Sequence, residues 1–275
     1  MYSEHTPQAI ANRCYQVRIG QYFKEGWQIF SSQPAPYIGF LVLMTIINGL
    51  LNNIPRVGLI VSTILSGPFA AGYYFFSFRI AHNQRPTFSE FFNGFKNNYF
   101  LPILLTNLAM VLITNVFVIS ASILFMIAGL PLLQSILEQA AAEAAEPDAD
   151  LEQLLALLEQ LPPVPAGLTP VLIFLGVVLL LPAIYFGIAY VFAVPLVVEH
   201  QFDVWPALET SRRLVSRNWW RFFFLIVSIV FCNILGVCLC CVGLLVTGPW
   251  SNCVIVAAYR DIIGLRPTTD TTNPS

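Results

Sequence analysis

A long apolar run between Phe100 and Ile119 limits what this chain can become, because thirteen of its residues are Leu, Ile, Phe or Val. About 20 mainly apolar residues are enough for a helix to cross the hydrocarbon core of a bilayer. At roughly −0.45 kcal/mol each, the thirteen favour insertion by about 6 kcal/mol. Asn107 and Asn115 oppose insertion, but even the ~3 kcal/mol of a charged residue at both positions would only balance that gain. The run therefore predicts a transmembrane helix.

The rest of the chain has the same character. Of its 275 residues, 57% are hydrophobic and 10% are charged, whereas soluble domains carry about 25% charged residues. Hydropathy resolves six spans, near residues 37–54, 57–80, 99–130, 168–198, 220–238 and 242–262. We predict an all-α integral membrane protein with six transmembrane helices.

The basic residues predict the direction of these spans. Twelve of the thirteen Lys and Arg residues lie before the first span, between the second and third, between the fourth and fifth, or after the sixth, and Arg56 is the exception. The segment after the third span is acidic instead. Because basic residues are retained on the cytoplasmic side, we expect both termini to face the cytoplasm.

Each basic segment that precedes an outgoing span has apolar residues at helical spacing. The three stripes are Ile19, Tyr22, Phe23, Trp27 and Phe30; Phe88, Phe91, Phe92, Phe95 and Tyr99; and Val204, Ala207, Leu208, Ser211 and Val215. A stripe with a polar back face and basic flanks is typical of an amphipathic helix in the membrane interface. We predict such helices over residues 15–32, 87–98 and 203–217.

The pattern predicts three repeats, each made of one interfacial helix and two spans. The repeats would occupy residues 1–86, 87–200 and 201–266, followed by a disordered tail at 267–275. The middle repeat also carries an acidic segment at 132–165, rich in Ala, Glu, Gln and Leu and ended by three Pro residues. These residues favour helix, and Pro147 interrupts them. We expect a helical hairpin that rests on the external membrane face.

Two of the predicted returning spans contain a related motif. The sequence SGPFAAGYYFFSFR at 66–79 returns at 247–260 as TGPWSNCVIVAAYR. The shared positions are Gly67, Pro68 and Arg79 in the first copy, and Gly248, Pro249 and Arg260 in the second. In the middle repeat, Pro182 stands ten residues before Phe192, as Pro68 stands before Phe78.

The chemistry of this motif suits a membrane helix. We expect the two Arg residues at the cytoplasmic boundary, with Phe78 and Tyr259 beside them as interfacial anchors. The Pro residues predict kinks near the bilayer midplane, and the Gly residues permit close packing of helices. The alternative is a hinge or a solute site at a broken helix. We favour the packed kink.

The remaining candidates are polar residues inside the predicted spans. They are Asn48, Asn107, Thr114, Asn115 and Asn233. Hydrogen bonds between helices are the favoured interpretation, and a polar pathway through the repeats is the alternative. Five of the six Cys residues lie in apolar sequence, and those of the run CNILGVCLCC at 232–241 are interpreted as small packing residues in preference to a soft-metal site. Glu199-His200 is interpreted as a solvated helix end. No catalytic signature is found, so we predict no catalytic residue, no metal site and no cofactor.

Three stretches resemble a known group of proteins. They are RIGQYFKEGWQIF at 18–30, IPRVGLIVSTILSGPFAAGYYFFSFRIAHNQRPTFSEFFNGFK at 54–96 and PLVVEHQFDVWPALETSRRLVSRNWW at 195–220. The chain is similar there to six-helix bacterial membrane proteins of the YciC-like group. Some relatives of that group are labelled as the membrane domain of glycerophosphodiester phosphodiesterases. The resemblance implies a protein of the bacterial cytoplasmic membrane, and no catalytic activity, because the catalytic barrel has no counterpart here.

Two functional hypotheses follow. The first is a non-enzymatic membrane protein that supports the envelope or assembles with membrane or cytoplasmic protein partners. The alternative is a carrier of a small solute or lipid, which the threefold arrangement suggests. Neither involves nucleic acid.

Overall fold

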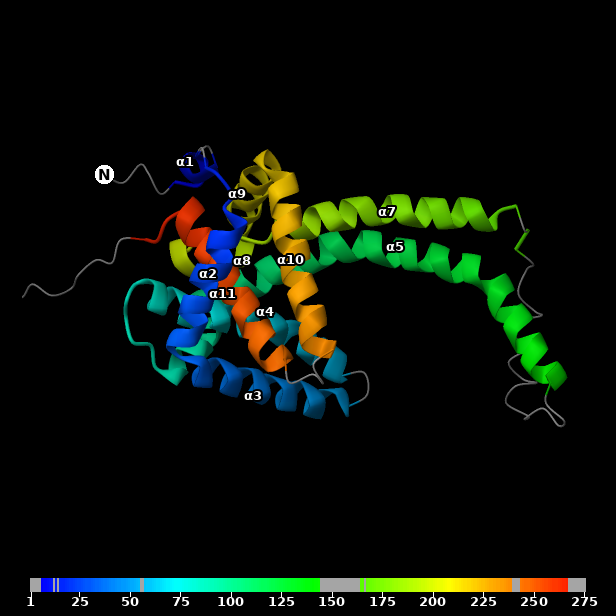
Figure 1. Cartoon of the computed structure of the whole chain (residues 1–275), viewed down its shortest axis with the longest axis horizontal. Helices are drawn as coiled ribbons and strands as arrows, with labels where there is room; N and C mark the ends of the chain where they lie inside the picture. The colour runs from blue at the N-terminus through cyan, green and yellow to red at the C-terminus, as the bar shows by residue number, and fades with distance from the viewer. Residues whose placement is uncertain are drawn as a thin grey trace, which may run out of the picture. The chain divides into compact units, whose positions relative to one another are not determined.

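The computed structural model describes residues 6–11, 13, 15–54, 57–143, 164–165, 167–238 and 243–266, and all regular elements in these ranges are helical (Figure 1). The predicted tail at 267–275 and most of the predicted acidic hairpin lie outside the described residues. The helices are α1 Pro7–Ala11, α2 Ile19–Ser32, α3 Pro34–Asn52, α4 Val57–Ala81, the 3₁₀ helix η2 Phe88–Phe95, α5 Asn97–Glu143, α7 Thr169–Ala189, α8 Ala193–His200, α9 Val204–Arg217, α10 Trp219–Cys238 and α11 Leu244–Ile262.

Four helical segments are long and apolar enough to cross a membrane. They are Pro34–Leu51, Asn97–Gln139, Thr169–His200 and Trp219–Cys238. Between 11% and 22% of each apolar window is buried inside the protein. Side chains such as Leu112, Phe174 and Phe231 are instead more than half exposed. Because water would penalise so much exposed apolar surface, lipid must cover it. The chain is therefore a multi-pass membrane protein.

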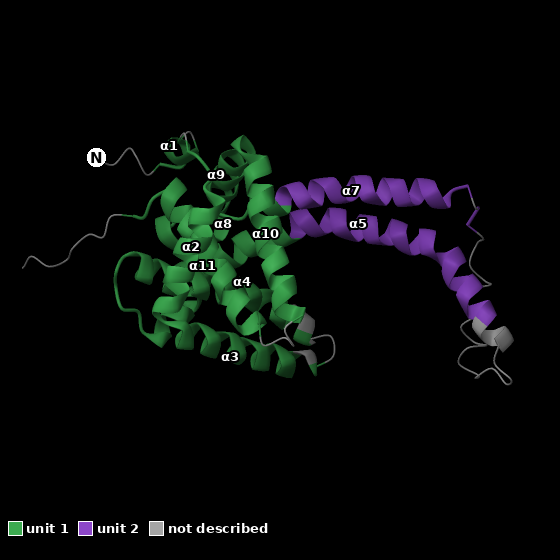
Figure 2. Cartoon of the chain, viewed as in Figure 1, with its two compact units in different colours: residues 1–111, 187–275 green, residues 112–186 purple. Residues whose placement is uncertain are grey.

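The chain forms two compact units (Figure 2). Unit 2 contains residues 112–186, and its described helical residues belong to α5 and α7. Its two helices touch at Gly176, where a Cβ atom would lie 2.9 Å from the Phe125 ring. The Phe117 and Phe186 rings are stacked with centroids 6.0 Å apart. The first part of the predicted external hairpin, residues 132–143, continues α5 instead of starting a new helix.

Unit 1 contains residues 1–111 and 187–275. Each of its three amphipathic helices packs on a helix of the preceding predicted repeat, with the third repeat preceding the first, so the packing is cyclic. The helix α2 packs on α11, η2 packs on α4, and α9 packs on α8. The helix α11 also packs on α3, α4 and α10. Each segment predicted to lie in the membrane interface is thus attached to a helix that precedes it in the chain or, for α2, to the last helix.

The predicted interfacial helix at 87–98 is wrong in its helix type. Residues Phe88–Phe95 form a 3₁₀ helix, and α5 begins at Asn97. In a 3₁₀ helix the side chains at i and i+3 eclipse one another, so Phe88, Phe91 and Gly94 lie on one side. Phe91 is fully buried, and a Cβ on Gly94 would meet the Pro68 carbonyl oxygen at 2.6 Å. The close approach to α4 explains the tighter turn.

The predicted span at 168–198 is two helices, α7 and α8, with a break at 190–192. Ser211 on α9 occupies this break. Its hydroxyl donates to the Ala189 carbonyl at 2.7 Å and accepts from the Phe192 N–H at 3.2 Å. These bonds satisfy backbone groups that a continuous helix would have paired internally. Ser211, the one polar member of the third stripe, therefore holds a helix junction.

Aromatic side chains fill the core of unit 1. The Phe91 ring is stacked between Phe40 and Phe76, with centroids 4.3 Å from each. Tyr37 and Tyr73 contact the same ring edge-on, each at 5.9 Å. Edge-to-face and offset-stacked pairs at these distances add to the gain from burial. This cluster joins α3, α4 and η2.

Candidate functional site

The centre of unit 1 is closed by three aromatic side chains from α4, α11 and the break before α8. Tyr259 lies between the other two, with ring centroids 5.1 Å from Phe78 and 5.8 Å from Phe192. All three are at most 2% exposed. Each stands ten residues after a Pro of the related motifs, Pro68, Pro182 or Pro249. We call Phe78, Phe192 and Tyr259 the aromatic centre.

This burial corrects one sequence-based expectation. Phe78 and Tyr259 are not anchors in the membrane interface, because their rings face one another inside the protein. The aromatic residue that stands ten positions after the Pro therefore packs one helix against another. The sequence could not separate the two roles, because both favour an aromatic residue at the end of a span.

A polar cluster lies next to the aromatic centre. The Tyr259 hydroxyl and the Nδ1 atom of His200 are 2.6 Å apart, and His200 is buried. The neighbouring Glu199 carboxylate lies 2.8 Å from His82 Nε2 and accepts a bond of 3.0 Å from the Arg266 N–H. The interpretation of Glu199-His200 as a solvated helix end is thus wrong. The two residues connect α8 with α11 and with the ends of α4 and the described chain.

Both Arg residues of the related motifs pair with a carboxylate on the segment packed against their helix. Arg260 of α11 lies 2.7 Å from Glu25 of α2. Arg79 of α4 lies 3.8 Å from Glu90 of η2 and donates to the Gln84 amide oxygen at 2.8 Å. Burial raises the pKa of Glu25, but the Gln21 amide and the Arg260 guanidinium outweigh it, so this pKa lies below its ordinary value.

The third carboxylate, Glu209 of α9, has a different partner. The α8 position that corresponds to Arg79 and Arg260 is Ala193. Glu209 instead pairs within α9, with Arg212 at 2.8 Å and Arg213 at 2.5 Å. Arg212, assisted by Arg213, lowers the pKa of Glu209 to about 2. The stability from this pairing is present above the unfolded pKa of about 4.3 and is lost as the pH falls through the lowered value.

The two Gly-Pro pairs differ in their surroundings. A Cβ atom on Gly67 would lie 2.9 Å from the Asn107 Cβ, whereas one on Gly248 would meet only Leu41 Cδ2 at 3.9 Å within the described residues. Pro68 and Pro249 are both buried inside continuous helices. The expected close helix contact therefore exists at Gly67 and not at Gly248.

This difference predicts unequal effects for the same substitution. We expect Gly67→Leu to lower the free energy of unfolding by about 2–3 kcal/mol, because the added side chain would push α5 from α4. Gly248→Leu should change it by less than about 1 kcal/mol. Unfolding of detergent-solubilised protein measures both values. Equal losses for the two variants would contradict the assigned contact.

The polar residues inside the predicted spans have separate roles. Asn107 of α5 donates to Ser66 of α4 at 3.0 Å, and Asn233 of α10 donates to Ser251 of α11 at 2.8 Å. Both bonds join helices, as the favoured interpretation requires. Asn48 donates to the Met44 carbonyl of its own helix. Thr114 and Asn115 belong to unit 2, and Asn115 is exposed.

Cys253 packs in the interior of unit 1. It is fully buried, and its Sγ atom lies 3.7 Å from Ser77 Oγ, which is itself 2.6 Å from the Tyr37 hydroxyl. Among the described residues, no group of three His, Cys, Asp or Glu side chains could hold a metal ion.

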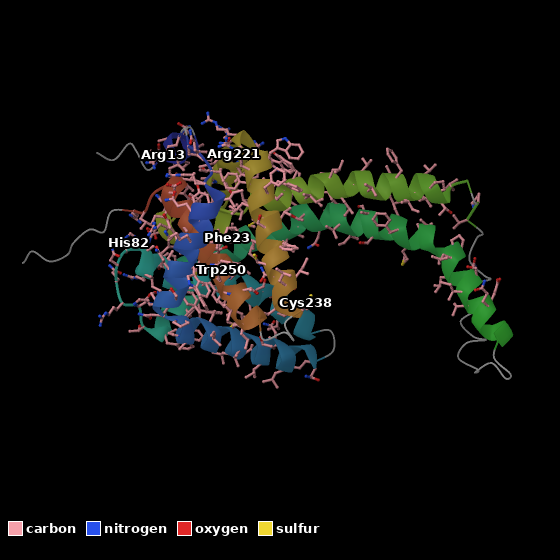
Figure 3. All side chains as sticks on the ribbon, viewed as in Figure 1. Arg13, Phe23, His82, Arg221, Cys238 and Trp250 are labelled. Carbon is pink, nitrogen blue, oxygen red and sulfur yellow. The ribbon has the colours of Figure 1, made fainter. Side chains whose placement is uncertain are left out.

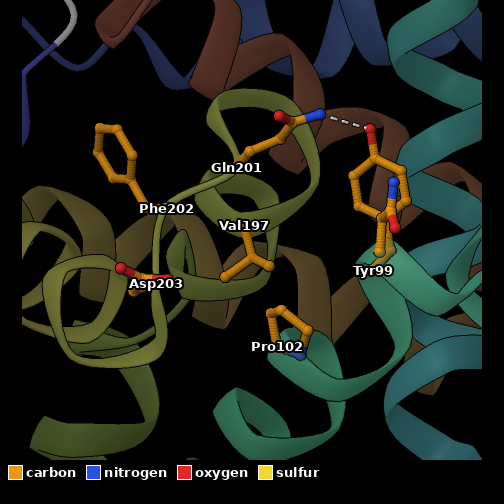
Figure 4. A pocket seen from close by; sticks show the side chains of 7 residues that line it. Tyr99, Pro102, Val197, Gln201, Phe202 and Asp203 are labelled. Carbon is orange, nitrogen blue, oxygen red and sulfur yellow. Dashed lines mark hydrogen bonds between the residues drawn. The ribbon is translucent and has the colours of Figure 1, made fainter.

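A small cavity of about 260 Å³ opens between the first turn of α5 and the α8–α9 connection (Figure 4). Its lining residues are Asn98, Tyr99, Pro102, Val197, Gln201, Phe202 and Asp203. Gln201 has a φ of 56° and donates to the Tyr99 hydroxyl at 2.7 Å across the mouth. The cavity lies beside exposed residues and does not reach the aromatic centre.

Sequence reasoning missed the glycines that let the short helices α2 and η2 approach their neighbouring helices closely. A Cβ on Gly26 of α2 would lie 2.8 Å from the Val254 backbone of α11, and one on Gly72 of α4 would collide with the Phe91 carbonyl oxygen of η2. Gly26 and Ser211 occupy the same place, seven residues after the first residue of their stripes. A small residue at this shared place was the available signal. Phe23 and Trp27 of α2 contact the Trp250 ring edge-on, and Figure 3 shows Phe23 near Trp250.

The described helices thus define a multi-pass membrane protein with a tightly packed aromatic centre. No protein-family model matches this chain, and no curated protein or solved structure is detectably similar to it.

Proposed function

We propose that the chain is a non-enzymatic scaffold protein of the bacterial cytoplasmic membrane, which assembles with protein partners or supports the envelope. Six spans in three repeats, with both termini in the cytoplasm, belong to this proposal, as does membership of the YciC-like group. The cyclic packing of α2 on α11, η2 on α4 and α9 on α8 supports the threefold organisation. The pairing of Arg79 and Arg260 with carboxylates of the neighbouring segment supports it independently.

The observation that carries the scaffold function is the closed aromatic centre. A carrier built from three repeats would conduct its solute between the returning helices, at the place where the repeats meet. There, the Tyr259 ring contacts both Phe78 and Phe192, and all three side chains are at most 2% exposed. Tightly packed rings leave no path for a solute, because native cores contain few voids larger than a water molecule.

Transport measurements in proteoliposomes test this function. We expect purified protein to leave the scrambling rate of a fluorescent phospholipid, and the uptake of radiolabelled glycerol and amino acids, equal to those of protein-free vesicles. Asn98→Ala changes the lining of the small cavity and leaves the aromatic centre intact. It is therefore the matched control for flux through a site outside the centre. Protein-dependent flux that Phe192→Trp abolishes would favour a carrier over a scaffold.

A further inference from the structure

Three arginine residues lie near the junction of α9 and α10. Arg217 ends α9 and donates to the Arg13 carbonyl at 3.3 Å, and Arg13 in turn donates to the Ile263 carbonyl. Arg221 lies in the first turn of α10, where its N–H donates to the Asn218 carbonyl at 3.0 Å. Figure 3 shows Arg13 and Arg221 at the same end of unit 1, opposite Cys238 at the other end of α10. We call Arg13, Arg217 and Arg221 the arginine cluster.

The arginine cluster differs in charge balance from five other arginines of unit 1. Arg18, Arg79, Arg212, Arg213 and Arg260 each lie within 4 Å of a carboxylate. No carboxylate of the described chain pairs with a member of the cluster. Arg217 and Arg221 are exposed. The positive charge of this surface is therefore free to meet an external anion.

An exposed apolar stripe begins beside the arginine cluster and follows α10. It consists of Trp220, Phe224, Val227, Phe231 and Ile234, which are 45% to 68% exposed. The spacing i, i+4, i+7, i+11 and i+14 places all five on one face of the helix. From the first to the last, the stripe extends for about 21 Å at 1.5 Å per residue. One leaflet of the hydrocarbon core is about 15 Å thick, so the stripe can accompany a whole acyl chain.

We propose that this surface binds an anionic phospholipid, with the phosphate at Arg217 and Arg221 and an acyl chain along the stripe. Guanidinium groups bind phosphate through paired N–H donors. Trp220, 68% exposed, stands between the charged and apolar parts, at the depth where Trp side chains prefer to lie in a bilayer. A soluble acidic partner would satisfy the arginines but would leave the apolar stripe uncovered.

Binding measurements on the full chain in zwitterionic nanodiscs test the proposal. Short-chain phosphatidylglycerol is the probe, and short-chain phosphatidylcholine and inorganic phosphate are the comparison ligands. The double variant Arg217→Gln/Arg221→Gln should bind phosphatidylglycerol about 30-fold more weakly, since each cation near an anionic headgroup contributes about fivefold. Arg217→Lys/Arg221→Lys should bind more tightly than the Gln variant, because it keeps the charge, and more weakly than the wild type, because an ammonium group cannot make the paired bonds.

Arg85→Gln is the matched control, because Arg85 is an exposed arginine in the segment between α4 and η2. It removes the same charge and should leave the affinity unchanged. Should the double variant not fold, Arg221→Gln alone should weaken binding about fivefold, because the Arg221 side chain makes no polar contact with the described protein. Trp220→Ala should weaken binding of the lipid and not of inorganic phosphate.

Three results would overturn the proposal. The first is equal affinity for phosphatidylglycerol and phosphatidylcholine in the wild type. The second is a loss with Arg85→Gln as large as that with Arg217→Gln/Arg221→Gln. The third is binding of inorganic phosphate as tight as that of phosphatidylglycerol, which would make the cluster a site for free anions.

Discussion

Phe91→Ala is expected to lower the free energy of unfolding by about 3–5 kcal/mol, the cost of removing a large aromatic side chain from a packed core. Phe91 is fully buried, and its ring is stacked against both Phe40 and Phe76 at 4.3 Å. Its removal would separate η2 from α3 and α4, because these rings are the core that the three helices share. Denaturation of micelle-solubilised protein by sodium dodecyl sulphate measures the change.

Phe92→Ala is the matched control for this prediction. Phe92 follows Phe91 in the same 3₁₀ helix, but its side chain is 37% exposed. The same chemical change should therefore cost about 1 kcal/mol or less. A loss from Phe92→Ala equal to that from Phe91→Ala would show that η2 does not sit in the described orientation.

The second large effect is expected from a single added methyl group. A Cβ atom on Gly26 would lie 2.8 Å from both the Cα and the N atom of Val254. Backbone atoms cannot move aside as a flexible side chain can, so Gly26→Ala should push α2 away from α11 and cost about 2–3 kcal/mol. Thermal unfolding in detergent should detect the change as a clear fall in Tm.

Gly20→Ala provides the opposite expectation in the same helix. Apart from Gly20 itself, its chain neighbours and the backbone of its own helix, no heavy atom of the described residues lies within 4 Å of a Cβ placed on Gly20. Because Ala favours helix over Gly by up to about 1 kcal/mol, this variant should be neutral or slightly more stable than the wild type. If both variants were neutral, the close contact between α2 and α11 would not exist in the membrane protein.

The helical character and the membrane class could be predicted from the sequence, because apolar runs such as Phe100–Ile119 are too long for any other solution. The amphipathic stripes also correctly indicated α2 and α9. Asn107 and Asn233, both singled out as polar residues inside apolar runs, make hydrogen bonds between helices in the structure. In each of these cases the information is local: a run, a spacing, or a polar residue with few partners available in lipid.

The features that could not be predicted from the sequence depend on which helix lies opposite a given residue in the fold. The α7–α8 break follows from Ser211, which is distant in sequence and supplies the bonds at that junction. The difference between Gly67 and Gly248 arises because Asn107 faces Gly67, whereas no described side chain comes as close to Gly248. The role of Phe78 and Tyr259 required knowing that α4 and α11 meet. Periodicity reports which face of a helix is apolar, but not whether lipid or protein covers it.

Accessibility of position 192 to water tests most directly whether the aromatic centre is closed. Phe192→Cys is placed in a background without the six native Cys residues, and membranes are treated with a charged, water-soluble thiol reagent. Gln84→Cys serves as an exposed control. We predict that Cys at position 84 is modified within minutes and that Cys at position 192 reacts only after denaturation. Modification of position 192 in the folded protein would mean that the centre opens to water, and this result would contradict the scaffold and support the carrier.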